Sequence, residues 1–138
     1  MIESISKVFC DTSFFYAALD ENDFDHERAI SFAQWIKENH VAVLTTWEIV
    51  IETVTLLRYR LNYKGAAVFV KTVLPNLNII YLSDSDRAKA LDTFLKLSKD
   101  KKISLCDAIS YTVIKEYLEG IPCIAFDADF RAMGLRVM

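Results

Sequence analysis

Several acidic residues of this 138-residue chain stand where apolar runs end or where helical patterns begin. They are Asp11, Glu48, Glu52, Asp107, Asp127 and Asp129. Carboxylates within about 4 Å of one another repel by about 1 kcal/mol per pair in water and by about 4 kcal/mol at an effective dielectric constant of about 20. A divalent cation relieves this repulsion, and oxygen ligands without His or Cys suit Mg²⁺ or Mn²⁺. Because helix N-termini nearby also favour phosphate, the set predicts metal-assisted hydrolysis of phosphodiester bonds.

Helix capping is the alternative role for single members of this set. An aspartate at a strand-to-helix turn commonly caps the helix, and this description fits Asp11 and Asp107 individually. Acids that follow three separate apolar runs are harder to explain as caps, because parallel strands bring their carboxyl ends to one edge of a sheet. We therefore expect a shared metal site.

The two glutamates occupy one predicted helix. Glu48 and Glu52 are four residues apart, so they share a helix face, and Glu52 lies one turn further from the preceding strand. We expect one to point inward and the other to lie nearer solvent, and Glu48 is able to substitute for Glu52.

Apolar runs alternate with helical periodicities along the whole chain. Strands are predicted at 7–10, 41–46, 78–82 and 121–126, with a last edge strand at 135–138. Helices are predicted at 12–19, 25–38, 47–61 and 64–74, after Ser83, and from Ser104 to Gly120. This alternation implies right-handed crossovers and an open, mainly parallel sheet covered by helices on both faces. Such sheets carry their sites at the carboxyl ends of the strands.

Composition excludes several classes of protein. With 53% apolar and 25% charged residues, the chain is expected to form a single domain over residues 1–138 rather than a disordered segment. Its three glycines are not clustered, which argues against a glycine-rich phosphate loop. A net charge of −3 argues against binding nucleic acid by bulk positive charge. The sequence shows no signal peptide and no membrane span, so we expect a cytoplasmic protein.

The other reactive side chains have structural roles in this interpretation. The three cysteines, Cys10, Cys106 and Cys123, lack metal-ligand spacing and are predicted to be reduced and buried. His26 is predicted to be exposed or near a helix cap, and Trp47 to pack in the core or in a dimer. Scattered basic residues are candidates for a local rim that contacts nucleic acid: Arg58, Arg60, Lys64, Lys101, Lys102, Arg131 and Arg136. A further group is expected to supply the core and an interaction surface: Phe14, Phe15, Tyr16, Phe32, Trp35, Phe69 and Phe94.

An ordered set of short motifs resembles a PIN domain, most closely the VapC-type toxins of toxin–antitoxin modules. The motifs are Phe9-Cys-Asp-Thr-Ser13, Asp23-x-x-His26-x-x-Ala29, Thr45-Thr46 through Glu52 to Arg58, Ser104-Leu-Cys-Asp-Ala-Ile109, and Ala125-Phe-Asp-Ala-Asp-Phe130 with Gly134. Each motif is short, but together and in this order they span nearly the whole chain. The bulky Trp47 and the extra carboxylate of Glu48 depart from the family pattern.

The resemblance implies a three-layer α/β/α fold and a Mg²⁺- or Mn²⁺-dependent endoribonuclease. The residues that correspond to the family's acidic quartet are Asp11, Glu52, Asp107 and Asp127. Metal ligands would come from Asp11, Asp107, Asp127 and Asp129, and auxiliary groups from Thr12, Ser13 and Glu48. The implied partners are an RNA substrate, a cognate antitoxin protein and a second copy of the chain.

Two other enzyme classes with acids at strand ends fit poorly. A receiver-like phosphoacceptor needs adjacent acids after the first strand, but Thr12 follows Asp11. A haloacid-dehalogenase-like phosphatase needs Asp-x-Asp, but Ser13 occupies the second position. The remaining alternative is a PIN fold that acts in RNA processing, or as an RNA-binding or scaffold module, outside a toxin pair.

Overall fold

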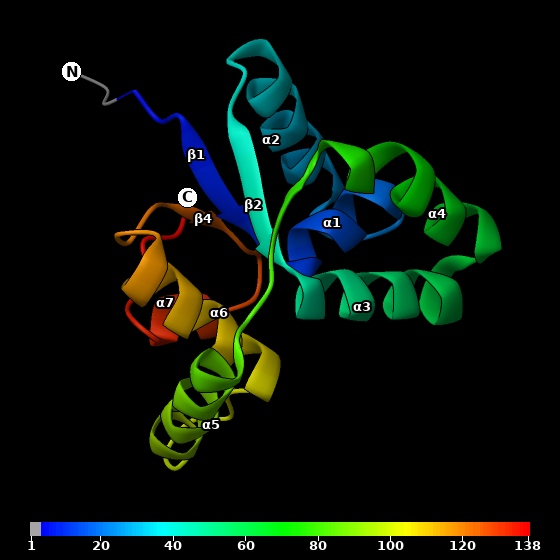
Figure 1. The fold of residues 1–138 in the computed structure, drawn as a ribbon. Coiled ribbons are helices and arrows are strands. Elements are labelled where there is room, and N and C mark those ends of the chain that lie inside the picture. The colour runs from blue at the N-terminus through cyan, green and yellow to red at the C-terminus, as the bar shows by residue number, and fades with distance from the viewer. Residues whose placement is uncertain (1–3) are drawn as a thin grey trace.

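Four short parallel strands form the centre of the molecule. The computed structural model describes residues 4–138 and places the strands in the order β3-β2-β1-β4 (Figure 1). The strands are β1 (Lys7–Cys10), β2 (Ala42–Thr46), β3 (Asn78–Ile80) and β4 (Cys123–Ile124). Val8 pairs with Val43 across the two central strands, and both side chains are buried. Because all the strands are parallel, their carboxyl ends meet at one edge of the sheet.

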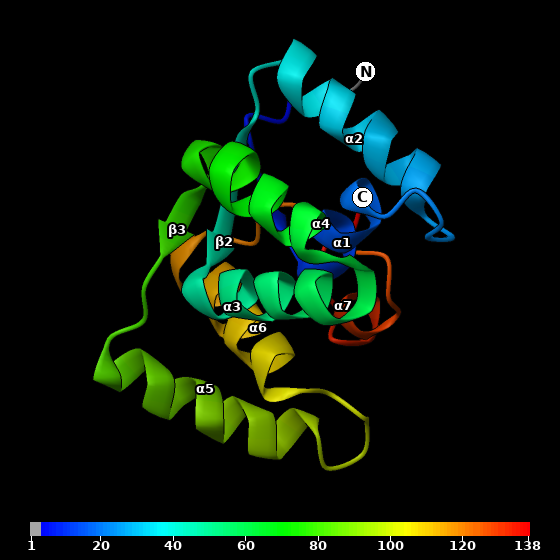
Figure 2. The ribbon, with the colours of Figure 1, turned by 90° about the vertical axis from the view of Figure 1, so that its right-hand side faces the viewer.

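Helices cover both faces of this sheet. They are α1 (Thr12–Leu19), α2 (His26–Glu38), α3 (Trp47–Leu56), α4 (Tyr63–Val68), α5 (Asp84–Leu97), α6 (Leu105–Tyr117) and α7 (Asp129–Ala132). Helices α1, α2 and α4 lie on one side, and α6 and α7 on the other (Figure 1). Helix α5 packs along α6 and stands away from the sheet (Figure 2). The predicted three-layer α/β/α fold is confirmed. Residues 1–3 of the predicted domain lie outside the described residues.

Two predicted helices change type along their length. The helix predicted at 47–61 is α-helical to Leu56 and continues as a π-helical segment, Leu57–Leu61. The helix predicted at 64–74 begins as α4 and continues as a second π-helical segment, Phe69–Val73, and a 3₁₀ turn, Leu74–Asn76. Apolar periodicity does not separate these helix types, because a change of about one residue per turn or less, over about one turn, hardly alters the pattern.

The fourth and fifth predicted strands are shorter than expected. The run 121–126 contributes only Cys123–Ile124 to the sheet, because the backbone N–H of Phe126 donates to the Ser13 hydroxyl instead of to a strand. The predicted edge strand at 135–138 is wrong: Val137 forms a single isolated bridge to Cys123. The short helix α7 was not predicted.

The core lies between the sheet and its helices. Phe9, Phe69 and Phe130 are fully buried, and the Phe69 ring contacts the Phe15 ring edge-on at 5.4 Å. The aromatic group predicted to supply both core and surface is buried or half-buried throughout, so its core role is confirmed and its role in an interaction surface stays a prediction. The fully or largely exposed rings are others: Phe24, Tyr59, Tyr63 and Tyr81.

The remaining expectations concern thiols and membranes. The three cysteines form no disulfide within residues 4–138. Cys10 and Cys123 are buried as predicted, whereas Cys106 is half-buried. In the part of the chain that the structure describes, no helix combines the length and apolar character needed to cross a bilayer.

Candidate active site

Asp11 both caps a helix and enters the site. It follows β1, and its Oδ2 atom accepts hydrogen bonds from the Ser13 backbone N–H at 3.2 Å and from the Ser13 hydroxyl at 2.9 Å. The same hydroxyl accepts a bond of 2.9 Å from the Phe126 backbone N–H, which joins the start of α1 to the segment after β4. Asp11 is 4% exposed. A buried, fixed carboxyl group therefore lies at the centre of the strand ends.

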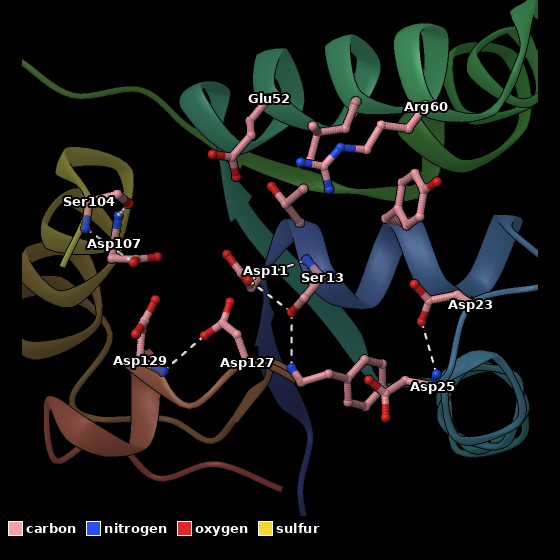
Figure 3. Close-up of a pocket in the computed structure, with 14 residues that line it drawn as sticks. Asp11, Ser13, Asp23, Asp25, Glu52, Arg60, Ser104, Asp107, Asp127 and Asp129 are labelled. Carbon is pink, nitrogen blue, oxygen red and sulfur yellow. Dashed lines mark hydrogen bonds between the residues drawn. The ribbon is translucent and has the colours of Figure 1, made fainter. Parts of the chain in front are cut away.

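Asp107 lies in the first turn of α6 and is held by a capping box. Its backbone N–H donates to the Ser104 hydroxyl at 3.0 Å, and its Oδ2 atom accepts from the Ser104 backbone N–H at 3.4 Å. This reciprocal pair satisfies two helix N–H groups and fixes the aspartate rotamer. With 8% exposure, the residue is buried while its carboxyl group faces the pocket (Figure 3).

Asp127 and Asp129 follow β4 at the start of α7. The Oδ1 atom of Asp127 accepts a hydrogen bond of 3.0 Å from the Asp129 backbone N–H. Both side chains turn toward the space in front of Asp11 and Asp107 (Figure 3). The acids predicted after the first and last strands thus lie on facing sides of one space.

The two predicted glutamates have different surroundings. Glu52 lines the pocket from α3 (Figure 3), whereas Glu48 is absent from the pocket lining. The Oε1 atom of Glu48 is buried and has no hydrogen-bond partner among residues 4–138. Burial raises the pKa of the Cys106 thiol, and the charges of Glu52 and Glu48 add to this effect. Glu52 is therefore the glutamate that meets the other acids, and Glu48 lies outside the pocket.

These acids line a pocket of about 440 Å³ at the carboxyl edge of the sheet. It is lined by Asp11, Thr12, Ser13, Tyr16, Asp23, Asp25, Glu52, Leu56, Arg60, Ser104, Asp107, Phe126, Asp127 and Asp129. Figure 3 shows five of the acids around its middle and Asp23 and Asp25 at one end. Thr12 is buried in the wall, where its hydroxyl accepts a bond of 3.3 Å from the Thr53 hydroxyl.

Burial and mutual repulsion shift Asp11, Asp107 and Asp127 toward their protonated forms. Burial, followed by the charge of Asp127, raises the pKa of Asp11 to about 7, although the two Ser13 hydrogen bonds oppose this. Burial and Asp127 also raise the pKa of Asp107 to about 6. Burial also raises the pKa of Asp127, and the negative charges of Asp129 and Glu52 raise it further. Such a cluster is stabilised by any cation that enters it.

The donor atoms of the pocket fit a hard divalent cation. The acids offer carboxylate oxygens, and no His or Cys lines the pocket within the described chain. Mg²⁺ and Mn²⁺ prefer such oxygen ligands and keep several waters. Among residues 4–138, no group of three or more His, Cys, Asp or Glu side chains is already arranged to hold a metal ion. Rotation of the carboxyl groups that face the pocket would be needed to bring them onto one ion.

Sequence reasoning missed several residues of the pocket. Tyr16 enters it from α1, where its hydroxyl donates to Asp20 at 2.8 Å. Asp23 and Asp25 come from the acidic loop before α2, which gave no signal of its own for a site. Ser104 did carry a signal, because Ser-x-x-Asp before an apolar helix is a capping-box pattern.

Other predicted residues lie elsewhere. The Nδ1 atom of His26 lies 2.7 Å from the Ala17 carbonyl oxygen, so this half-buried ring joins α2 to α1. Trp47 is 42% exposed and packs on Tyr81 with ring centroids 6.1 Å apart, so it does not lie in the core, and the predicted alternative, packing in a dimer, stays a prediction. Of the seven predicted basic residues, Arg60 alone lines the pocket in the described part of the chain.

A parallel sheet of this order, with a cluster of acids at its carboxyl edge, is the arrangement that the resemblance to PIN domains implies, and comparison with known proteins agrees with it. Residues 8–135 match the PIN domain, and the chain belongs to the PIN-domain family. A VapC ribonuclease from Archaeoglobus fulgidus is 32% identical over 123 residues, which cover 87% of this chain and 76% of that relative.

Solved structures show the same fold. VapC20 from Mycobacterium tuberculosis, described as a Sarcin-Ricin loop cleaving toxin, superposes with a TM-score of 0.77 and 26% identity, covering 93% of this chain and 95% of that one. VapBC2 from Rickettsia felis was solved bound to a promoter DNA fragment. It superposes with a TM-score of 0.68 and 12% identity, covering 96% of this chain and 97% of that one. The second likeness concerns the fold alone.

Proposed function

We propose that this protein is a metal-dependent endoribonuclease and the cytoplasmic toxin of a toxin–antitoxin pair. The observation that carries the proposal is the meeting of Asp11, Glu52, Asp107 and Asp127 in one pocket, where burial and repulsion raise the pKa values of the three aspartates. Perturbed acids that share a cleft are typical of catalytic sites. The 32% identity to a VapC ribonuclease supports RNA as the substrate.

The acids are assigned two roles according to where they lie in the pocket. Asp11 and Asp107, with Asp127 and Asp129, are the residues that would hold Mg²⁺ or Mn²⁺. When bound, such an ion supplies charge neutralisation and lowers the pKa of water. Glu52, on the opposite wall, is placed to accept the proton of an attacking water.

Backbone and hydroxyl groups complete the proposed site. The N-termini of α1 and α6 both begin at the pocket, and helix N-termini favour a phosphate group. Ser13 holds the Asp11 carboxyl group by two donors, so it orients this acid. Thr12 orients the same turn from its buried position in the wall.

Two protein partners belong to the same proposal: a cognate antitoxin and a second copy of the chain. An apolar cavity of about 730 Å³ supports the first, and Phe14, Phe15, Ile36 and Val73 contribute to its lining. An amphipathic segment buries its apolar side chains in a groove of this kind. Support for the second copy comes from exposed leucines on α5.

Cleavage of total cellular RNA tests the proposed activity. The purified chain, refolded to remove any bound partner protein, is incubated with Mn²⁺ or Mg²⁺, with a chelator, and beside the Asp107→Asn variant. We expect cleavage that needs the metal and falls at least a hundredfold in Asp107→Asn, because a ligand charge is lost while the capping geometry stays. Equal cleavage by the variant would point to a contaminating nuclease. Absence of cleavage by the folded wild-type protein would favour a binding or scaffold module.

A further inference from the structure

The pocket contains a basic side chain whose role the acidic site does not explain. Among the residues that line it, seven carry carboxyl groups, and Arg60 is the sole cation of that set within the described chain. Arg60 lies in the π-helical segment Leu57–Leu61, beyond the end of α3. Its side chain extends toward the middle of the pocket, between Glu52 on one side and Asp23 on the other (Figure 3).

The π-helical segment explains this direction. Eight residues separate Arg60 from Glu52, and in a regular α-helix such a pair lies about 80° apart around the axis. A π turn takes up more residues than an α turn, so each residue in Leu57–Leu61 advances by a smaller angle. The widened turn therefore brings Arg60 back toward the face of Glu52. Single π turns inside α-helices frequently occur at functional sites.

The guanidinium group of Arg60 is available for a ligand. The ion pairs found among residues 4–138 are Arg28–Asp25, Arg87–Asp84, Lys89–Glu116 and Lys96–Asp92. Arg60 takes part in none of them, although seven carboxyl groups line the same pocket. Its five N–H donors lie in one plane in a forked arrangement, so two of them can donate to two oxygens of the same phosphate or carboxylate group.

We infer that Arg60 binds a phosphate of the RNA backbone next to the one that the acids hold for cleavage. This inference rests on the proposed ribonuclease function. An RNA strand that brings one phosphate to the acids must pass a second phosphate through a strongly negative pocket, which repels it. Arg60 offsets that repulsion at the end of the pocket away from Asp107 and Asp129, and its fork fixes where the strand enters. It is a positioning residue for the substrate.

The test measures binding separately from cleavage. A short fluorescein-labelled single-stranded RNA is titrated with full-length protein carrying Asp107→Asn, in Mg²⁺, over a series of KCl concentrations. The added variants are Arg60→Ala, Arg60→Lys and Arg58→Ala. Arg58 was a candidate for the same basic rim, but it does not line the pocket. It is the matched control, because it is exposed on the same π-helical segment.

We expect Arg60→Ala to weaken RNA binding about tenfold and to lower the slope of log K against log salt by about 0.7, the value for one phosphate contact on a single strand. Arg60→Lys retains the slope but binds more weakly than the parent Asp107→Asn protein, because lysine keeps the charge and lacks the planar arrangement of donors. Arg58→Ala changes neither affinity nor slope. A role of Arg60 in folding alone would not move the salt slope.

Two results would overturn the inference in different ways. The first result is that the wild-type chain cleaves RNA, but Arg60→Ala binds RNA with the same affinity and the same salt slope as Arg58→Ala. Arg60 then does not contact the substrate, and an acidic group of a protein partner becomes its candidate ligand. If the wild-type chain neither cleaves cellular RNA nor binds the labelled strand, the proposed function itself fails.

Discussion

At the scale of single residues, Asp11 links the stability of the fold to the pH. Its carboxyl pKa is raised to about 7 by burial first and by Asp127 second. In the unfolded chain the same group has a pKa of about 3.9. The folded state therefore holds a proton that the unfolded state releases between about pH 4 and pH 7. Rising pH favours unfolding across this window, and the metal-free protein loses stability there.

Asp11→Asn should remove that loss. Asparagine is as good an N-cap as aspartate and accepts the Ser13 hydrogen bonds without a charge. We expect the wild type to lose about 2 kcal/mol more stability than Asp11→Asn between pH 5 and pH 8. Urea unfolding in EDTA at the two pH values measures this difference. Mn²⁺ at pH 8 should stabilise the wild type and have little effect on Asp11→Asn. An identical pH dependence in both proteins would show that Asp11 is ionised in the fold.

The residues of the site could be predicted where the sequence shows a strand end or the start of a helix. Asp11 and Asp127 follow apolar runs, so their meeting at one edge follows from parallel topology alone. Arg60 carries no such signal, because its direction depends on a π turn that the apolar pattern does not reveal. The choice between Glu48 and Glu52 likewise depends on how α3 is rotated about its axis, which packing decides.

At the scale of elements, the chain offers two capping boxes that separate stability from function. Ser104 and Asp107 start α6 at the pocket, while Ser83 and Asp86 start α5 with the same reciprocal hydrogen bonds. We expect Ser104→Ala and Ser83→Ala each to lower stability by about 1 kcal/mol, since each removes one N-cap. Ser104→Ala alone should reduce RNA cleavage, because it also releases the rotamer of Asp107.

Thermal unfolding and initial cleavage rates of the two variants provide the comparison. Both should show similar losses in melting temperature. A drop in cleavage of equal size in Ser83→Ala would mean that activity follows overall stability and that the Ser104 box has no special part in holding Asp107.

The limits of sequence-based prediction at this scale lie in the short strands. β1 and β2 are predicted almost to the residue, because their β-branched and apolar runs are central and buried. The run 121–126 is equally apolar, yet only two residues pair as β4. Two residues of this run donate backbone hydrogen bonds outside the four-stranded sheet, Phe126 to the Ser13 hydroxyl and Cys123 to the Arg136 carbonyl oxygen, and no local pattern encodes these bonds.

At the scale of the whole molecule, α5 leaves apolar side chains without cover. It packs along α6, but Leu91 and Leu95, which are one turn apart, are 51% and 69% exposed. A stable interface buries about 800 Å² on each partner, close to a tenth of the accessible surface of 8367 Å². Such an apolar pair on a projecting helix suits the centre of a contact with a second copy, as the proposed homodimer requires.

Leu95→Glu should therefore dissociate a dimer without unfolding its subunits. A charge at the centre of an apolar contact must lose its hydration on association, which costs several kcal/mol, whereas the same charge on the free helix stays in water. Ile30→Glu is the matched control, because Ile30 is 44% exposed on α2, which lies across the sheet from α6 and α5 (Figure 1). Sedimentation equilibrium should show dimers for the wild type and Ile30→Glu and monomers for Leu95→Glu. Dimers that persist in Leu95→Glu but dissociate in Ile30→Glu would place the interface on the α2 face, beside the apolar cavity proposed for the antitoxin, and the two partners would then compete for one surface.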